Sequence, residues 1–127
     1  MPLSNYARSK TYDHIFGRAS WTMPATVYVG LNTADPTPAG SGAEVSGGGY
    51  ARKALTMGAS TNGVGENSAL VNFGTASASW GTVTHASIWD ALSGGNMLAY
   101  GTLTASKTVA SGDTFDFPIG DLDAAFS

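Results

Sequence analysis

Residues 80–104, WGTVTHASIWDALSGGNMLAYGTLT, predict two β-strands joined by a tight turn, and we expect this hairpin to be the centre of the fold. In the first strand the side chains alternate between two faces, with Val83, His85, Ser87 and Trp89 on one and Thr84, Ala86, Ile88 and Asp90 on the other. Small and apolar residues occur on both faces, which is typical of a strand inside a sheet. The turn, Ser93-Gly94-Gly95-Asn96, contains residue types that accept a positive φ.

One helix precedes the strands. Residues 3–17, LSNYARSKTYDHIFG, have Ser4 as a candidate N-cap, Gly17 as the residue after the last turn, and one side formed by Leu3, Ala7, Thr11 and Ile15. Tyr12 and Phe16 widen this stripe, so we expect a helix that packs through one side.

Short strands account for most of the remaining chain. They are expected at 25–31, at 50–58, from residue 70 onward, in both arms of the hairpin, and in a last pair formed by 106–110 and 113–118. About seven strands with Gly-rich turns predict an all-β fold, an antiparallel β-sandwich or jelly-roll-like domain. We expect one domain over 1–127, with the sandwich at 25–118. The tail at 119–127 contains Leu122 and Phe126, which could pack on the body or on a neighbour.

Two polar connections separate the early strands. Residues 32–49, NTADPTPAGSGAEVSGGG, predict either a surface excursion or an arm that orders against a partner. The three glycines at 47–49 are not followed by the Lys and Ser or Thr of a phosphate-binding loop, so we expect them to free the backbone before Tyr50. Residues 59–68, ASTNGVGENS, predict a second Gly-rich connection.

The composition limits the classes of partner. Charged residues make up only 12% of the 127 residues, which favours a protein packed into an assembly. The net charge is −3 and the six basic residues form no stripe, so we expect no nucleic-acid partner. There is no cysteine, no apolar run long enough for a membrane span, and no secretory signal pattern. We therefore expect a protein made in the cytoplasm of its cell, with no membrane partner.

The polar residues do not form a catalytic or metal-binding pattern. A hydrolase would pair His85 with Asp90, or with Asp13 and His14, as a base and its orienting group, but no nucleophile motif accompanies them. Carboxylates at positions 113, 116, 121 and 123 lack the spacing of a calcium loop. We expect structural roles for these residues, no cofactor, no metal, and no enzymatic activity.

The aromatic residues permit two interpretations. Trp21, Trp80 and Trp89, together with the tyrosines, could form a stacking platform for sugars, aided by the loop at 60–68. In a small sandwich, large aromatic side chains more often anchor the core or an interface, and the sequence favours that interpretation.

Three stretches suggest a family. They are LSNYA with DH and G in the helix, then PATVYVGLNTADPTPAGSGAEVSGGGYARKAL, and then NFGTASASWGTVTHASIWDALSGGNMLAYGTLTASKTVASGDTFDFPIGDL. Together they resemble small virion proteins of tailed bacteriophages, commonly labelled phage tail fibre or putative tail proteins. The most specific pieces are EVSGGGYAR at 44–52 and WGTVTH at 80–85. The resemblance implies a virion location after assembly in the host bacterium, and no catalytic residues.

Small size and the lack of repeats favour decoration of a shell over a long fibre. We therefore expect a non-enzymatic structural protein on the phage particle, with head decoration (a cement protein) as the first hypothesis. The alternative is a tail or tail-fibre-associated protein that binds host-surface carbohydrate. Its partners would be capsid or tail proteins and further copies of itself, with a trimer as one form. The predicted contact residues are Tyr6, Ile15, Phe16, Asp35, Glu44, Tyr50 and Arg52.

Overall fold

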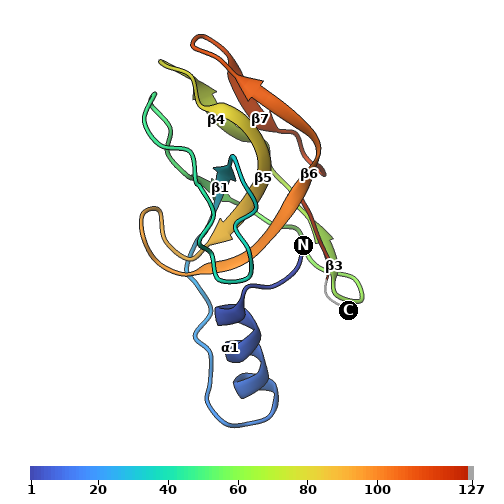
Figure 1. Ribbon diagram of the computed structural model, residues 1–127. Helices are drawn as coiled ribbons and strands as arrows, with labels where there is room; N and C mark the ends of the chain where they lie inside the picture. Colours follow the sequence, from blue (N-terminus) through green and yellow to red (C-terminus); the bar gives the residue numbers. More distant parts are fainter. Residues whose placement is uncertain (126–127) are drawn as a thin grey trace.

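Short antiparallel strands build the molecule, and one helix projects from them (Figure 1). The computed structural model describes residues 1–125. The elements are α1 (Asn5–Ile15), β1 (Val27–Asn32), β2 (Lys53–Leu55), β3 (Val64–Glu66), β4 (Val71–Thr75), β5 (Gly81–Trp89), β6 (Met97–Val109), β7 (Thr114–Phe117) and β8 (Asp123–Ala125). The expectation of an all-β, sandwich-like fold with one N-terminal helix is confirmed.

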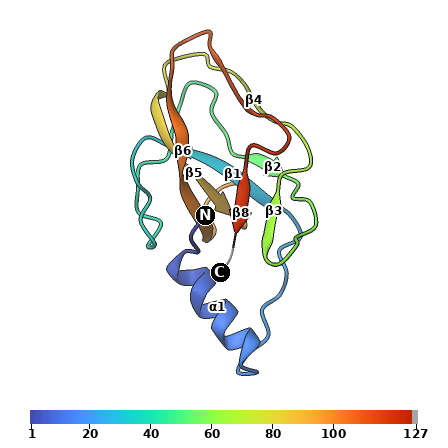
Figure 2. The ribbon, with the colours of Figure 1, turned by 90° about the vertical axis from the view of Figure 1, so that its right-hand side faces the viewer.

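Three sheets enclose the core. The largest has the order β2-β1-β5-β6, and two smaller sheets pair β3 with β8 and β4 with β7. From the large sheet, Val29, Leu31 and Val83 are fully buried. They belong to one apolar cluster with Phe73 of β4 and with Phe115 and Phe117 of β7. The three phenylalanine rings meet edge to face, with centroids 5.1–6.1 Å apart. Figure 2 shows β3, β8 and β4 across from the large sheet.

The β5–β6 hairpin is confirmed, but its connection is not a tight turn. Residues 90–96 join the strands, and the Asp90 carboxylate closes this loop by accepting the Asn96 N–H (2.7 Å) and an Asn96 side-chain N–H (3.0 Å). Gly94 and Gly95 have φ of 64° and 72°, as the sequence predicted. The longer loop has a role in the site described below.

A bulge changes the alternation within the hairpin. Val83 pairs with Lys107 and His85 with Thr102, so residues 103–106 of β6 lie opposite Thr84 alone. The shift turns Val83 into the core together with Ala86 and Ile88, and its expected place beside His85 was therefore wrong. The same bulge lets β6 continue to Val109, so residues 106–110 are not a separate strand.

The last strands also pair differently from the prediction. β7 pairs with β4 and not with residues 106–110, because the latter already pair with β5. The connection at 59–68 contains β3, and the tail contains β8, so residues 1–125 form eight strands where about seven were expected. Leu122 of the tail is buried in the core, and Phe126 lies outside the described residues.

Helix α1 is attached to the strands through its first turn. Ser4 is the N-cap, because its side chain accepts the Ala7 N–H (3.0 Å), and Gly17 has φ 70° after the last turn. Ala7 is fully buried, whereas Ile15 at the other end is 68% exposed. The predicted packing stripe therefore does not extend to Ile15, whose side chain is mostly exposed. Both views show α1 standing away from the strands (Figures 1 and 2).

The loop at 32–49 folds back onto β1. The Val45 N–H donates to the Leu31 carbonyl (2.9 Å), and the Thr33 N–H donates to the Ala43 carbonyl (2.9 Å). Val45 is buried in the core, and Pro36 is also fully buried. The loop is thus attached to the large sheet near both of its ends, and about half of its residues are exposed.

Candidate functional site

Three of the seven predicted contact residues come together next to β1. The Arg52 guanidinium binds both carboxylate oxygens of Glu44, with N–O distances of 2.9 and 2.8 Å. The Tyr50 hydroxyl donates to the same carboxylate at 2.7 Å. We call Glu44, Tyr50 and Arg52 the clasp, because they join the loop at 32–49 to the chain that enters β2.

Arg52 extends the clasp to the β5–β6 loop. The third guanidinium nitrogen, Nη1, donates to the carbonyls of Ala91 (2.9 Å) and Gly94 (2.8 Å). The guanidinium carbon also lies 3.8 Å from the centroid of the Trp89 ring, a cation–π contact. Arg52 is only 7% exposed, so its charge is enclosed by an ion pair, two carbonyls and an aromatic face.

Tyr50 ties the clasp to the sheet. Its hydroxyl oxygen accepts the Leu31 N–H (2.9 Å), and its ring stacks on Phe73 with centroids 6.1 Å apart. Burial and the hydrogen bond to Glu44 raise the pKa of Tyr50 well above its ordinary range. Gly30 allows this approach, since a Cβ there would lie 2.9 Å from a Glu44 carboxylate oxygen and 3.0 Å from the Tyr50 hydroxyl.

The clasp is occupied by its own hydrogen bonds. Nearly every polar atom of Arg52 has a partner within the chain, and no buried side-chain nitrogen or oxygen of the described residues lacks one. This arrangement favours an architectural role for these three residues. Their direct contact with a partner stays a prediction.

The other predicted contacts lie at the helix and in the long loop. Tyr6 is half-buried and meets Trp21 edge to face, with centroids 6.2 Å apart. Asp35 is exposed and accepts the Thr37 N–H (2.8 Å), which shapes the loop.

Ile15 and Phe16 are 68% and 66% exposed, and Tyr12 beside them is 58% exposed. The Tyr12 and Phe16 rings lie 4.7 Å apart. We call Tyr12, Ile15 and Phe16 the helix end. Sequence reasoning found two of its members but gave Tyr12 no contact role, although the i, i+3, i+4 spacing of the three residues was visible.

The histidines have structural partners. His14 accepts the Trp21 N–H through Nδ1 (3.1 Å), and His85 lies between the hydroxyls of Thr84 (2.8 Å) and Thr102 (3.3 Å). Asp90 is bonded to Asn96, and Asp13 is paired with Arg18 at 3.2 Å. Neither pairing considered for a hydrolase is formed.

Among residues 1–125, no three His, Asp or Glu side chains are grouped so that they could hold a metal ion. In the same residues, no helix has the length and apolar character needed to cross a membrane.

The tryptophans differ in exposure. Trp80 is buried and donates its indole N–H to the Gly48 carbonyl (2.9 Å). Trp89 is half-buried under Arg52 and donates to the Ser87 hydroxyl (2.8 Å). Trp80 therefore serves the core, as the sequence favoured, and a sugar platform built from Trp21 and Trp89 stays a prediction.

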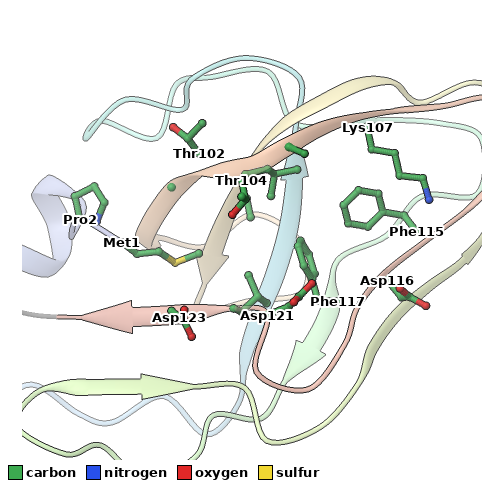
Figure 3. A pocket seen from close by; sticks show the side chains of 15 residues that line it. Met1, Pro2, Thr102, Thr104, Lys107, Phe115, Asp116, Phe117, Asp121 and Asp123 are labelled. Carbon is green, nitrogen blue, oxygen red and sulfur yellow. The ribbon is translucent and has the colours of Figure 1, made fainter.

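A groove of about 650 Å³ lies between β6 and the segment that runs from β7 to β8 (Figure 3). Its apolar lining includes Met1, Leu103 and Phe117, and its polar lining includes Thr104, Asp121 and Asp123. In Figure 3 the Met1 side chain lies between β6 and the strand that carries Asp123. We call this feature the acidic groove, because Asp116 also lines it and all three carboxylates are on exposed residues.

Comparisons with known proteins relate these features to a family. No curated protein matches the chain. A family model described as "Podophage GP4 fiber I protein gp80" matches residues 2–125, a range that contains α1, the clasp and almost all of the acidic groove. Since the match covers nearly the whole chain and agrees with the resemblance to phage tail fibre proteins, the chain belongs to the podophage GP4 fiber I protein gp80 family.

Proposed function

We propose that this protein is a non-enzymatic structural component of the fibre apparatus on a podophage virion. The observation that carries the proposal is the family match over residues 2–125. Head decoration, the first hypothesis from the sequence, gains no support from that family. The tail-fibre alternative is the one that the family favours.

The proposed role depends on surfaces that bury apolar area against other virion proteins. Charged residues are few in this chain, so much of its surface can be desolvated at little electrostatic cost. The exposed part of the 32–49 loop is one such surface, and the clasp fixes its orientation relative to the large sheet. A rigid loop loses little conformational entropy when it binds, which favours a stable attachment.

The test is to locate the protein in the particle. A cryo-EM difference map between particles with and without this protein should place the missing density on the fibres. Particles complemented with the gene in trans are the control and should regain the density. Difference density on the capsid lattice would instead favour head decoration, and it would contradict the proposal.

A second arm tests the absence of catalysis. Particles that carry His85→Ala, a change outside the clasp and the long loop, should assemble and infect as the parent does, provided that the purified variant protein folds. Loss of infection with intact assembly and fold would indicate chemistry that the proposal excludes.

A further inference from the structure

Two surface features have opposite charge and no role in the clasp. Residues 1–24 hold three of the six basic residues but only one of the nine acidic residues, which gives this segment a net charge of +2. The remainder of the chain carries −5. The positive segment contains the helix end, and the negative part supplies the three aspartates and most of the other residues that line the acidic groove, next to Met1 and Pro2.

The helix end is apolar and flanked by arginines. Tyr12, Ile15 and Phe16 are all more than half exposed. Arg8 lies one turn before Tyr12, where it donates to Asn5, and Arg18 follows two residues after Phe16. Both arginines are exposed, and the Arg18 side chain is 69% exposed even in its ion pair with Asp13.

The acidic groove has the complementary chemistry. Its floor contains apolar side chains of β6 and β7, and its exposed rim contains Asp116, Asp121 and Asp123. Lys107 is the only basic side chain among the described residues that line it, and its ammonium donates to the Thr114 carbonyl (2.5 Å). A volume of about 650 Å³ lies within the range of about 300–1,000 Å³ that is usual for binding pockets, so it has room for large side chains.

We propose that the helix end of one copy docks into the acidic groove of a second copy, so that copies of this chain join head to tail. Ile15 and Phe16 would bury their side chains in the groove, while Arg8 and Arg18 face the aspartates on its rim. The opposite charges of the two surfaces are the reason for choosing a second copy as the occupant. Each copy offers one of each surface.

The contact has to form between copies. The first turn of α1 is fixed to β6, because the Ser4 N–H donates to the Leu98 carbonyl (2.9 Å) and Ala7 is fully buried. An 11-residue helix extends about 16 Å from that attachment, which carries the helix end away from the body of its own chain. Contacts between two different surfaces of identical chains close into rings or continue as filaments.

Sedimentation velocity of the purified full-length chain tests the proposal first. We expect oligomers that grow with protein concentration and weaken as salt increases, since the rim charges are exposed and therefore screened. A chain that stays monomeric at every concentration and salt would overturn the proposal.

Two paired variants locate the contact. Ile15→Ser with Phe16→Ser removes the helix end, and Asp121→Lys with Asp123→Lys reverses the rim of the groove. Each pair should weaken association by about tenfold or more, because each removes one half of the interface. The matched control is Leu70→Ser with Leu92→Ser, which removes two exposed leucines outside both surfaces and should leave association unchanged.

Mixing the two paired variants distinguishes the possible geometries. The helix-end variant keeps an intact groove and the groove variant keeps an intact helix end, so the mixture should form one-to-one dimers and nothing larger. A symmetric contact between two helix ends would give no such dimer, and that outcome would overturn the proposal. The measurement uses the purified chain alone, so it can fail or succeed independently of where the protein lies on the particle.

Discussion

At the scale of the residue, Arg52 is the most heavily engaged side chain in the molecule. It pairs with Glu44, caps two carbonyls of the β5–β6 loop and covers Trp89. A planar guanidinium can satisfy all of these partners at once, whereas a lysine ammonium could not. An enclosed ion pair adds little net stability compared with apolar packing, but loss of one partner is costly because the other charge stays buried. The clasp therefore fixes geometry more than it adds stability.

Tyr50 predicts a dependence of stability on alkaline pH. Its pKa is raised in the folded chain by burial and by the Glu44 hydrogen bond, so the folded state keeps a proton that the unfolded state loses above about pH 10. The stability linked to Tyr50 is complete below that pH and is lost as the pH rises above it. Denaturant unfolding should show that Tyr50→Phe is less stable than the parent at neutral pH, and that the difference narrows above about pH 10. Tyr12→Phe, at an exposed position, is the control and should follow the parent.

Gly48 predicts a large cost for one added methyl group. Its φ is 60°, and a Cβ there would lie 2.8 Å from both the Ala78 carbonyl oxygen and the Trp80 indole nitrogen. We expect Gly48→Ala to lower the free energy of unfolding by about 3 kcal/mol, against about 1 kcal/mol for Gly47→Ala. Gly47 has φ 75° but open space around it, so it serves as the matched control. Equal costs for the two variants would show that backbone conformation alone, without the steric contact, sets the penalty.

At the scale of the element, Asn67 joins two segments that are distant in sequence, its own and the one between β7 and β8. Its side chain donates to the carbonyls of Ala69 (2.9 Å) and Pro118 (3.0 Å) and accepts the Leu122 N–H (2.9 Å). These bonds hold the end of β3 against the segment between β7 and β8, and Asn67 is fully buried.

Removal of the Asn67 amide should therefore be costly. Asn67→Ala leaves three backbone groups without their partner, and we expect a loss of about 3 kcal/mol in the free energy of unfolding. Asn72→Ala is the comparison, because Asn72 is exposed and its side chain accepts one local hydrogen bond, from the Gly74 N–H (2.6 Å). A cost for Asn67→Ala no greater than that for Asn72→Ala would contradict the role given to it here.

Regular elements were predictable from local pattern. Alternation found the β5–β6 hairpin, and capping residues found α1 within two residues at each end. The bulge at 103–106 was not predictable, because it depends on how β6 curves around the core and not on its own residue types. Strands β3 and β8 have three residues each, and they exist only because two remote segments pair. Strands this short carry no periodicity that a sequence could reveal.

The site was predictable to a smaller extent. Exposed apolar residues at the end of a helix can be identified from their spacing, and this spacing identified Ile15 and Phe16 as contact residues. The sequence placed Glu44, Tyr50 and Arg52 in one motif, but it could not show that β1 and the β5–β6 loop enclose them. That enclosure changes their interpretation from contact residues to an internal support.

At the scale of the whole molecule, the distribution of charge between the helical segment and the strands says more about binding than the net charge does. The net charge of −3 is the sum of +2 on residues 1–24, which include the helix, and −5 on the β-rich remainder. The low share of charged residues predicted that the protein is packed into an assembly, and the family match to a podophage fibre protein agrees with that expectation. Only the folded arrangement shows that the helical segment and the β-rich body present surfaces of opposite charge.

The bulge in β6 has a consequence for aggregation. β6 is the outer strand of the large sheet, and the free backbone groups of such a strand can recruit other β-rich chains. Residues 2–4 cover one part of this edge, where the Ser4 N–H donates to the Leu98 carbonyl and the Tyr100 N–H donates to the Pro2 carbonyl. Residues 103–106 bend the next part out of line, and Lys107 follows them. The strand thus lacks the long, straight, uncovered edge on which amyloid-like stacking would begin.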